Sequence, residues 1–115
     1  MIILISNPAP VKDEHEVIRQ IFDEGLEVFH LRRKKYSESE IRTFIENIPD
    51  KYHGKTVLHS HYHLAGEYGL RGIHVPPTFK GEMPGATLSV SFHSLEEIQK
   101  SELQFDYGFL SPVFD

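Results

Sequence analysis

The fold of this chain is indicated most clearly by residues 28–35, Val28-Phe29-His30-Leu31-Arg32-Arg33-Lys34-Lys35. The apolar residues Phe29 and Leu31 alternate with polar ones, which is typical of a buried strand whose side chains point to two faces in turn. Four consecutive basic residues follow at its carboxyl end. Ligands of parallel α/β proteins bind outside the carboxyl ends of the strands, so the cluster predicts an anion site suited to phosphate or pyrophosphate. A solvated basic loop is the alternative.

The composition narrows the class of protein. The chain has 115 residues, enough for one modest domain with its own core. Its formal net charge of −5 argues against a nucleic-acid or anionic-membrane partner. Because there is no cysteine, disulfides, thiolate catalysis and cysteine-ligated zinc are excluded. The opening Met1–Ser6 is apolar but has neither the charged leader nor the length of a signal peptide, and nothing approaches a membrane span. We therefore expect a cytoplasmic protein.

Strand-like and helix-like segments alternate along the whole chain. Short apolar or β-branched runs predict six strands, at residues 2–6, 26–31, 55–59, 72–75, 87–92 and 105–110. Helices are predicted between them, except across residues 78–86, where glycines and a proline indicate an irregular segment. Strands separated by helices in this rhythm form right-handed βαβ units and a parallel sheet.

Three of the predicted helices begin with a capping box, in which Asp or Ser is followed three residues later by Glu. The pairs are Asp13 with Glu16, Ser37 with Glu40, and Ser94 with Glu97. A further short helix is expected around residues 62–68. The side chains expected in the core are Val17, Ile18, Ile21, Phe22, Phe29, Ile41, Phe44, Ile45, Ile48, Leu95, Ile98, Phe105 and Phe109.

Two features favour a barrel over a doubly wound sheet. Polar residues recur at the strand ends, as expected where one ring of loops builds a site; they are Arg32, His59, His74, Ser91 and Ser111. The first strand is not followed by the glycine-rich loop of a dinucleotide-binding fold. Because a (β/α)8 TIM barrel takes about 200 residues or more, we expect residues 1–115 to be a single domain, the N-terminal part of such a barrel with about six βα units. The exposed edge of the sixth strand favours aggregation or pairing with another chain, which allows a homo-oligomer.

Five segments in one order along the chain carry a resemblance to a known family. They are His30-Leu31-Arg32-Arg33-Lys34 against the motif Gln-x-Arg-x-Lys, residues 57–65 against a third-strand segment with an Asp-Leu-Ala-like helix start, Gly72-Ile73-His74-Val75 against a Gly-x-His element, and residues 89–97 with 106–114 against the fifth and sixth strands. The ordered set resembles the thiamine phosphate synthase / thiazole tautomerase (TenI-like) superfamily, a group of (β/α)8 barrels.

The resemblance implies a transferase of thiamine biosynthesis, which joins a pyrimidine-methyl pyrophosphate to a thiazole phosphate and releases pyrophosphate with Mg²⁺ present. It implies that Arg32 and Lys34 are the catalytic residues, because they match the positions that hold the pyrophosphate. Ser91 matches a fifth-strand serine that can donate to a phosphate oxygen. The predicted substrate-binding residues are His30, Arg32, Lys34, His59, Ser60, His74 and Ser91, and no metal ligand is assigned.

The chain departs from the family pattern where Mg²⁺ is expected. His59-Ser60 replaces an Asn-Asp pair, and Pro77-Thr78-Phe79 replaces Gln-Glu-Asp, so both expected carboxylates are absent. His30 stands where the family has glutamine, and Pro112 where the tautomerase branch has its catalytic histidine. A tautomerase relative, or a non-catalytic binder or regulator of phosphorylated thiazole, is therefore the alternative to a synthase.

Histidines recur with alternate spacing in His59-Ser60-His61-Tyr62-His63, which invites a metal site. Since the strand is expected to end near His59, the three rings should diverge, which favours solvent-exposed or helix-capping histidines. His59 alone is expected at the functional face, as a donor that takes over part of the role of the missing magnesium. His74 is expected to form hydrogen bonds in the barrel mouth, and Arg33 and Lys35 to be solvated.

Overall fold

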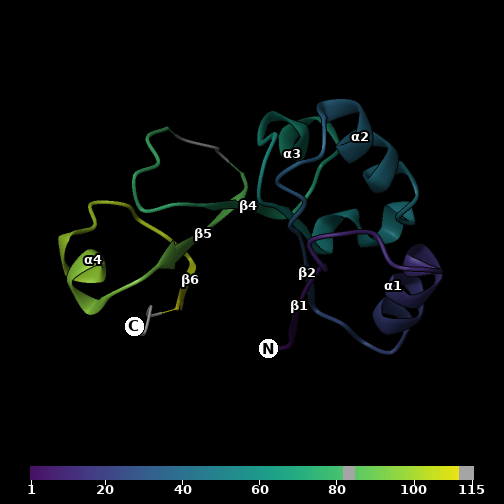
Figure 1. Cartoon of the computed structure of the whole chain (residues 1–115), viewed down its shortest axis with the longest axis horizontal. Helices are drawn as coiled ribbons and strands as arrows, with labels where there is room; N and C mark the ends of the chain where they lie inside the picture. Colours follow the sequence, from purple (N-terminus) through teal and green to yellow (C-terminus); the bar gives the residue numbers. More distant parts are fainter. Residues whose placement is uncertain (82–84, 112–115) are drawn as a thin grey trace.

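The computed structural model describes residues 1–81 and 85–111, and in them six strands form one parallel sheet (Figure 1). Neighbouring strands follow one another in chain order. The strands are β1 Ile3–Ile5, β2 Val28–Leu31, β3 Thr56–Leu58, β4 Gly72–Val75, β5 Thr87–Phe92 and β6 Tyr107–Leu110. The predicted order of parallel strands is confirmed.

The helices lie outside the arc of the strands (Figure 1). They are α1 Glu14–Asp23, α2 Glu38–Glu46, α3 His63–Glu67, α4 Leu95–Lys100 and the 3₁₀ helix η1 Asp50–Lys55. The described residues between β4 and β5 form no helix, as the sequence predicted; residues 82–84 lie outside the described part. No helix of the described part is long and apolar enough to cross a membrane.

The sheet is curled, and one contact across it shows how far. Strands in a sheet are about 4.8 Å apart, so β2 and β6, four positions apart, would be separated by about 19 Å in a flat sheet. Two side chains together cannot bridge that distance. Yet Nε2 of His30 on β2 lies 2.7 Å from the hydroxyl oxygen of Tyr107 on β6. The strands therefore form part of a TIM barrel, with a concave inner face, as the sequence predicted.

The hydrophobic core lies between the convex face of the sheet and the helices. Phe29 and Leu31 of β2 are fully buried there, together with Phe22 from α1 and Ile41 and Ile45 from α2. Full burial of an aliphatic or aromatic side chain contributes about 1.5–3 kcal/mol. The alternation along β2 places His30 between them on the opposite, concave face.

Two of the three predicted helix caps are confirmed. Ser37 Oγ accepts from the Glu40 N–H (3.2 Å), and the Glu40 carboxylate accepts from the Ser37 N–H (3.1 Å), which completes the capping box of α2. At α4, Ser94 Oγ accepts from the Glu97 N–H. The predicted box at Asp13 is wrong, because Asp13 adopts a left-handed conformation with φ of 57° and its side chain makes no cap.

Three residues that were predicted to be in the core are exposed. Val17 is 46% exposed, Leu95 66% and Phe105 37%. Val17 lines the open recess between β1 and α1, and α4 is so short that none of its residues is buried. Phe105 packs against Phe92, at 5.3 Å between ring centroids. The sequence also did not predict η1. Because η1 includes Lys55, β3 begins at Thr56 rather than at Lys55.

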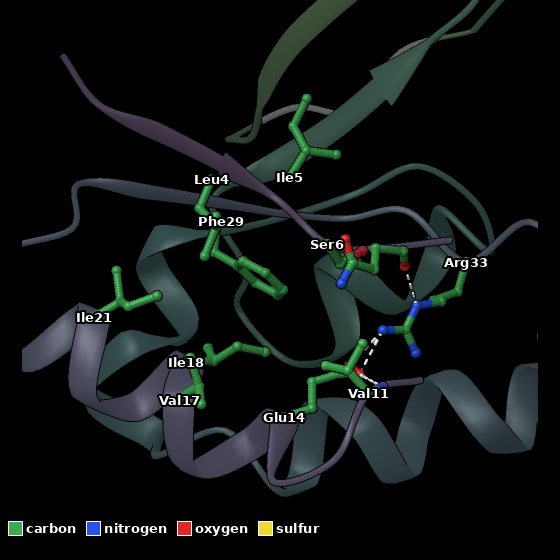
Figure 2. A pocket seen from close by; sticks show the side chains of 11 residues that line it. Leu4, Ile5, Ser6, Val11, Glu14, Val17, Ile18, Ile21, Phe29 and Arg33 are labelled. Carbon is green, nitrogen blue, oxygen red and sulfur yellow. Dashed lines mark hydrogen bonds and ion pairs between the residues drawn. The ribbon is translucent and has the colours of Figure 1, made fainter. Parts of the chain in front are cut away.

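The side chain of Arg33 is buried, so the prediction that it is solvated is wrong. It is 1% exposed, and its guanidinium lies 2.5 Å from a carboxylate oxygen of Glu14. The same guanidinium donates to the Asn7 carbonyl (2.5 Å) and to the Tyr36 hydroxyl (2.8 Å). Figure 2 shows this pair at one end of a largely apolar recess of about 160 Å³ between β1 and α1. Since all three of its nitrogens are bonded, Arg33 ties α1 to the strands and is not free to bind a ligand.

Replacing Glu14 with Ala should destabilise the protein strongly. Loss of one partner of a buried ion pair leaves the other charge uncompensated, at a cost of about 3–5 kcal/mol. Glu67→Ala is the matched control, because it removes an exposed ion pair with Arg42, and such pairs contribute about 0.2–1 kcal/mol. Urea unfolding measures both. Equal losses of unfolding free energy in the two variants would contradict the structural role of Arg33.

A methyl group at Gly72 should also destabilise the fold. Gly72 on β4 is paired with Thr87 on β5, and a Cβ atom at Gly72 would collide with the carbonyl oxygen and the hydroxyl of Thr87. Because a backbone atom blocks the site, we expect Gly72→Ala to lower the free energy of unfolding by about 1–3 kcal/mol. Gly54→Ala is the control, since its Cβ would meet no atom within 4 Å. Thermal unfolding midpoints of the two variants that coincide would refute this expectation.

Candidate functional site

The carboxyl ends of the strands surround a cavity of about 460 Å³ on the concave side of the sheet. Its lining includes Arg32, Lys34, His59, His74 and Ser91. Arg32 and Lys34 follow directly after β2, and both side chains are exposed at the rim. The alternation that continues from the strand places them on one side and Arg33 on the other. The rim therefore presents two exposed cations to the cavity.

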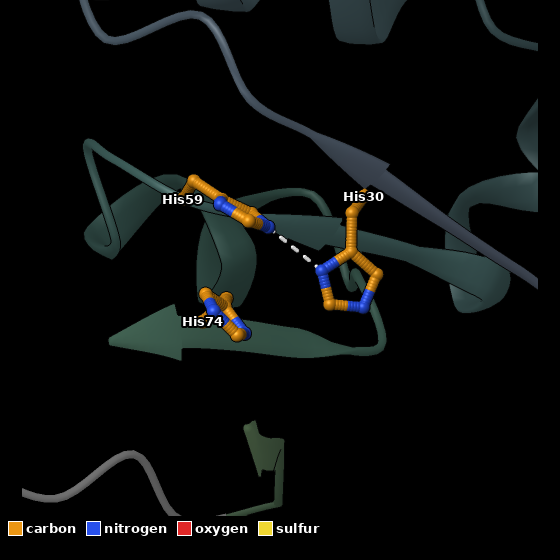
Figure 3. A group of neighbouring side chains, drawn as sticks. All are labelled: His30, His59 and His74. Atoms are coloured by element: carbon orange, nitrogen blue, oxygen red, sulfur yellow. Dashed lines mark hydrogen bonds between the residues drawn. The ribbon is translucent and has the colours of Figure 1, made fainter. Parts of the chain in front are cut away.

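Three histidines converge beneath this rim (Figure 3). They come from β2, from the residue directly after β3, and from β4, and they are His30, His59 and His74. Nδ1 of His30 lies 2.7 Å from Nε2 of His59, and the rings of His59 and His74 stack with 4.2 Å between centroids. One ring nitrogen from each of the three lies within 4.8 Å of those of the other two. We call these residues the histidine cluster.

Outer hydrogen-bond partners hold two rings of the histidine cluster in place. The hydroxyl oxygen of Tyr107 lies 2.7 Å from His30 Nε2. Two serines of β5 hold His74: Ser89 Oγ lies 2.7 Å from Nδ1, and Ser91 Oγ lies 2.5 Å from Nε2. Since a neutral imidazole carries a single N–H, these hydroxyls complete the hydrogen bonding of both rings whichever nitrogen is protonated.

Burial keeps the histidine cluster uncharged at neutral pH. It is the main cause that lowers the pKa of His30 to about 3, with His74 and Arg71 adding to it. Burial, followed by the neighbouring His74 and His30, lowers the pKa of His59 to about 2. For His74, burial and then the cations Arg32 and Lys34 lower the pKa to about 4. The site thus has its charge at the rim and neutral rings below.

The structure brings together all but one of the site residues that the sequence predicted. Arg32, Lys34, His59, His74 and Ser91 line the cavity, and His30 lies beneath, fully buried. Ser60 is half-buried and does not line the cavity, and its Oγ has no hydrogen-bond partner within residues 1–81 and 85–111. Pro112, at the position of the tautomerase histidine, lies outside the described residues.

The expected divergence of His59, His61 and His63 is confirmed. Nε2 of His61 lies 3.0 Å from the carbonyl oxygen of Tyr36, and Nε2 of His63 lies 2.6 Å from a carboxylate oxygen of Glu38. Sequence reasoning named each member of the histidine cluster, but it missed that the three converge, and it missed Ser89 and Tyr107. The available signal was the recurrence of histidine at the inward positions of three successive strand ends.

Comparison with known proteins identifies the family of this chain. A family model described as thiamine monophosphate synthase matches residues 2–115. The chain belongs to this family. The thiamine phosphate pyrophosphorylase of Bacteroides thetaiotaomicron has a similar crystal structure, with a TM-score of 0.80 and 32% sequence identity. The match covers 96% of this chain and 57% of that one, so the chain spans little more than half the length of this relative. No curated protein matches the chain.

Membership of the thiamine monophosphate synthase family raises the question of Mg²⁺, which the resemblance implied. Mg²⁺ requires hard oxygen ligands, usually carboxylates with water. The described residues that line the cavity include no Asp or Glu; they offer imidazoles, serine hydroxyls and two cations. These side chains do not fit a protein-bound Mg²⁺, and the cations at the rim oppose one. The described lining thus places two cations at the rim above neutral nitrogen donors.

Acidification should destabilise the protein through the histidine cluster. In the unfolded chain these rings have the ordinary pKa of 6.5, whereas the folded values are about 2 to 4. Below pH 6.5 the unfolded state binds more protons, so stability falls as the pH falls. Each ring contributes up to about 1.4 kcal/mol per pH unit in that window. Urea unfolding between about pH 7 and about pH 5, with chelator present, measures the slope.

The same titration in His74→Gln supplies the control for this pH dependence. This variant lacks one of the three titrating rings, so its slope should be smaller than that of the wild type. The other charged or titratable groups that act on the cluster are Arg32, Lys34, Arg71 and Tyr107, and they are unchanged in the variant. An identical slope in the two proteins would show that His74 does not contribute.

Proposed function

We propose that the chain is a transferase of the thiamine phosphate synthase type, which joins a pyrimidine-methyl pyrophosphate to a thiazole phosphate. The observation that carries the proposal is the pair of exposed cations, Arg32 and Lys34, at the rim of the cavity. A guanidinium holds phosphate oxygens through two parallel hydrogen bonds, and an ammonium adds a compact positive charge. Family membership supports this choice of substrates.

The proposed reaction needs little acid–base chemistry. The bond between the pyrimidine methylene carbon and the pyrophosphate oxygen breaks, and its electron pair leaves with the pyrophosphate. The lone pair of the thiazole nitrogen then forms the new carbon–nitrogen bond. Negative charge develops on the leaving group, so fixed cations beside it lower the barrier. Arg32 and Lys34 are the proposed catalytic residues, because they would contact that leaving group.

The remaining site residues have proposed roles in binding. Ser91 lines the cavity and can donate to a phosphate oxygen. His59 and His74 line it as neutral rings, and His30 supports His59 from below. Ser60 follows His59 directly, and its Oγ has no hydrogen-bond partner among the described residues, so it is proposed as a further donor to the ligand. As partners we propose phosphorylated small molecules rather than nucleic acid or a membrane, in keeping with the net charge of −5. The proposed location is the cytoplasm. We also propose that the chain forms a homo-oligomer.

A second candidate is a non-catalytic binder or regulator of phosphorylated thiazole. The observation in its favour is the lack of carboxylates in the described lining of the cavity, since a synthase of this family is expected to require Mg²⁺. Formation of thiamine phosphate from the two substrates, with and without Mg²⁺, separates the candidates. Product identifies a transferase. Binding of thiazole phosphate without product identifies a binder.

Substitution of either rim cation should reduce turnover. Removing one donor that stabilises developing negative charge typically lowers kcat by about 10²–10³-fold, and we expect this of Arg32→Ala and of Lys34→Ala. Lys35→Ala is the matched control, because Lys35 is exposed and does not line the cavity. Pyrophosphate affinity, measured by calorimetry, should fall in the same two variants. If Lys35→Ala had the same effect as the other two, general surface charge rather than this site would be responsible.

A further inference from the structure

We propose that His30, His59 and His74 bind one Zn²⁺ ion through one ring nitrogen each. Three imidazoles with an open fourth position are a common ligand set of zinc sites. The chain has no cysteine to offer instead, and imidazole suits zinc far better than it suits Mg²⁺. This inference does not depend on the transferase activity proposed above.

The spacing of the nitrogens is close to that of a tetrahedral site. Zinc–nitrogen bonds are about 2.0–2.1 Å, so two nitrogens on one tetrahedral ion are about 3.4 Å apart. In the histidine cluster His30 Nδ1 and His59 Nε2 are 2.7 Å apart, and all three ligand atoms lie within 4.8 Å of one another. The His30–His59 pair must open by about 0.7 Å to reach the required separation, and the third ring nitrogen already lies within 4.8 Å of the others.

The outer partners of the rings match those of metal-bound histidines. A histidine that binds a metal through one nitrogen usually donates a hydrogen bond from the other, which fixes its tautomer and orientation. His30 has this arrangement, because Nε2 lies against the Tyr107 hydroxyl and Nδ1 points to the cluster. In His74, either ring nitrogen can leave its serine hydroxyl and bind the ion, while the other nitrogen keeps its hydrogen bond to the second serine.

The open coordination position would face the cavity. His59 and His74 line the cavity, whereas His30 is buried beneath them. A phosphate oxygen that entered between Arg32 and Lys34 could occupy the fourth position, and its negative charge would offset the repulsion between the ion and these cations. The chemical class of ligand for that position is therefore phosphate or pyrophosphate.

Metal binding by the full chain, without a histidine tag, tests the site directly. The protein is stripped with a chelator, dialysed and titrated with Zn²⁺, and bound metal is measured by elemental analysis. We expect one equivalent of Zn²⁺ per chain. Co²⁺ as a probe should give the intense visible absorption of a tetrahedral site. No bound Zn²⁺, or only the weak spectrum of hydrated Co²⁺, would overturn the proposal.

Variants decide which residues hold the ion. His59→Gln and His74→Gln should each abolish stoichiometric binding, whereas His63→Gln should bind normally, because His63 is exposed and lies against Glu38. Tyr107→Phe keeps all three imidazoles and should weaken affinity by about 10–100-fold, as expected for loss of an outer partner. Circular dichroism checks that each variant folds. Should a histidine variant fail to fold, Tyr107→Phe and the Co²⁺ spectrum still decide. Unchanged binding in the cluster variants and in Tyr107→Phe, or loss in His63→Gln, would overturn the proposal.

Discussion

The contact between His30 on β2 and Tyr107 on β6 joins side chains from strands four positions apart, so it exists only because the sheet curls. Helices cover the convex face alone (Figure 1), and the concave face collects the inward side chains of successive strands. Polar groups are stable at such depth only when they are bonded, since an unpartnered one costs about 1–3 kcal/mol. The hydrogen bonds of the concave face therefore depend on the curvature of the sheet, and so does the site that they form.

The charged and the neutral side chains of this site lie at different depths in the barrel. Arg32 and Lys34 stay at the rim, where water screens their charge, and the histidine cluster lies below, where burial makes protonation unfavourable. The rim suits a phosphorylated ligand, and the neutral rings suit either hydrogen bonding or a soft metal ion. A carboxylate-bound Mg²⁺ fits neither layer of the described site. In this member of the thiamine monophosphate synthase family, two rim cations therefore lie above nitrogen donors rather than carboxylates.

Arg32 and Arg33 are neighbours in sequence with opposite environments. The alternation of the strand continues past Leu31, so Arg33 points to the helix layer and Arg32 to the cavity. The sequence indicated that the two residues face different ways, but it could not show that Glu14 lies ready to neutralise Arg33. That pairing joins residues 19 positions apart and depends on how α1 packs on the sheet. A pattern of exposed cations therefore described Arg32 and Lys34 correctly and Arg33 wrongly.

The sequence by itself determined the alternation of strands and helices, the parallel order, the caps at Ser37 and Ser94, and the polar residues at the strand ends. These features depend on interactions within a few residues, which a short window of sequence contains. Tertiary structure alone decided that His30 meets His59 and Tyr107, 29 and 77 residues away, and that Val17 and Leu95 remain exposed. These outcomes depend on the curvature of the sheet and on which element covers which face, and both are set by packing between distant segments.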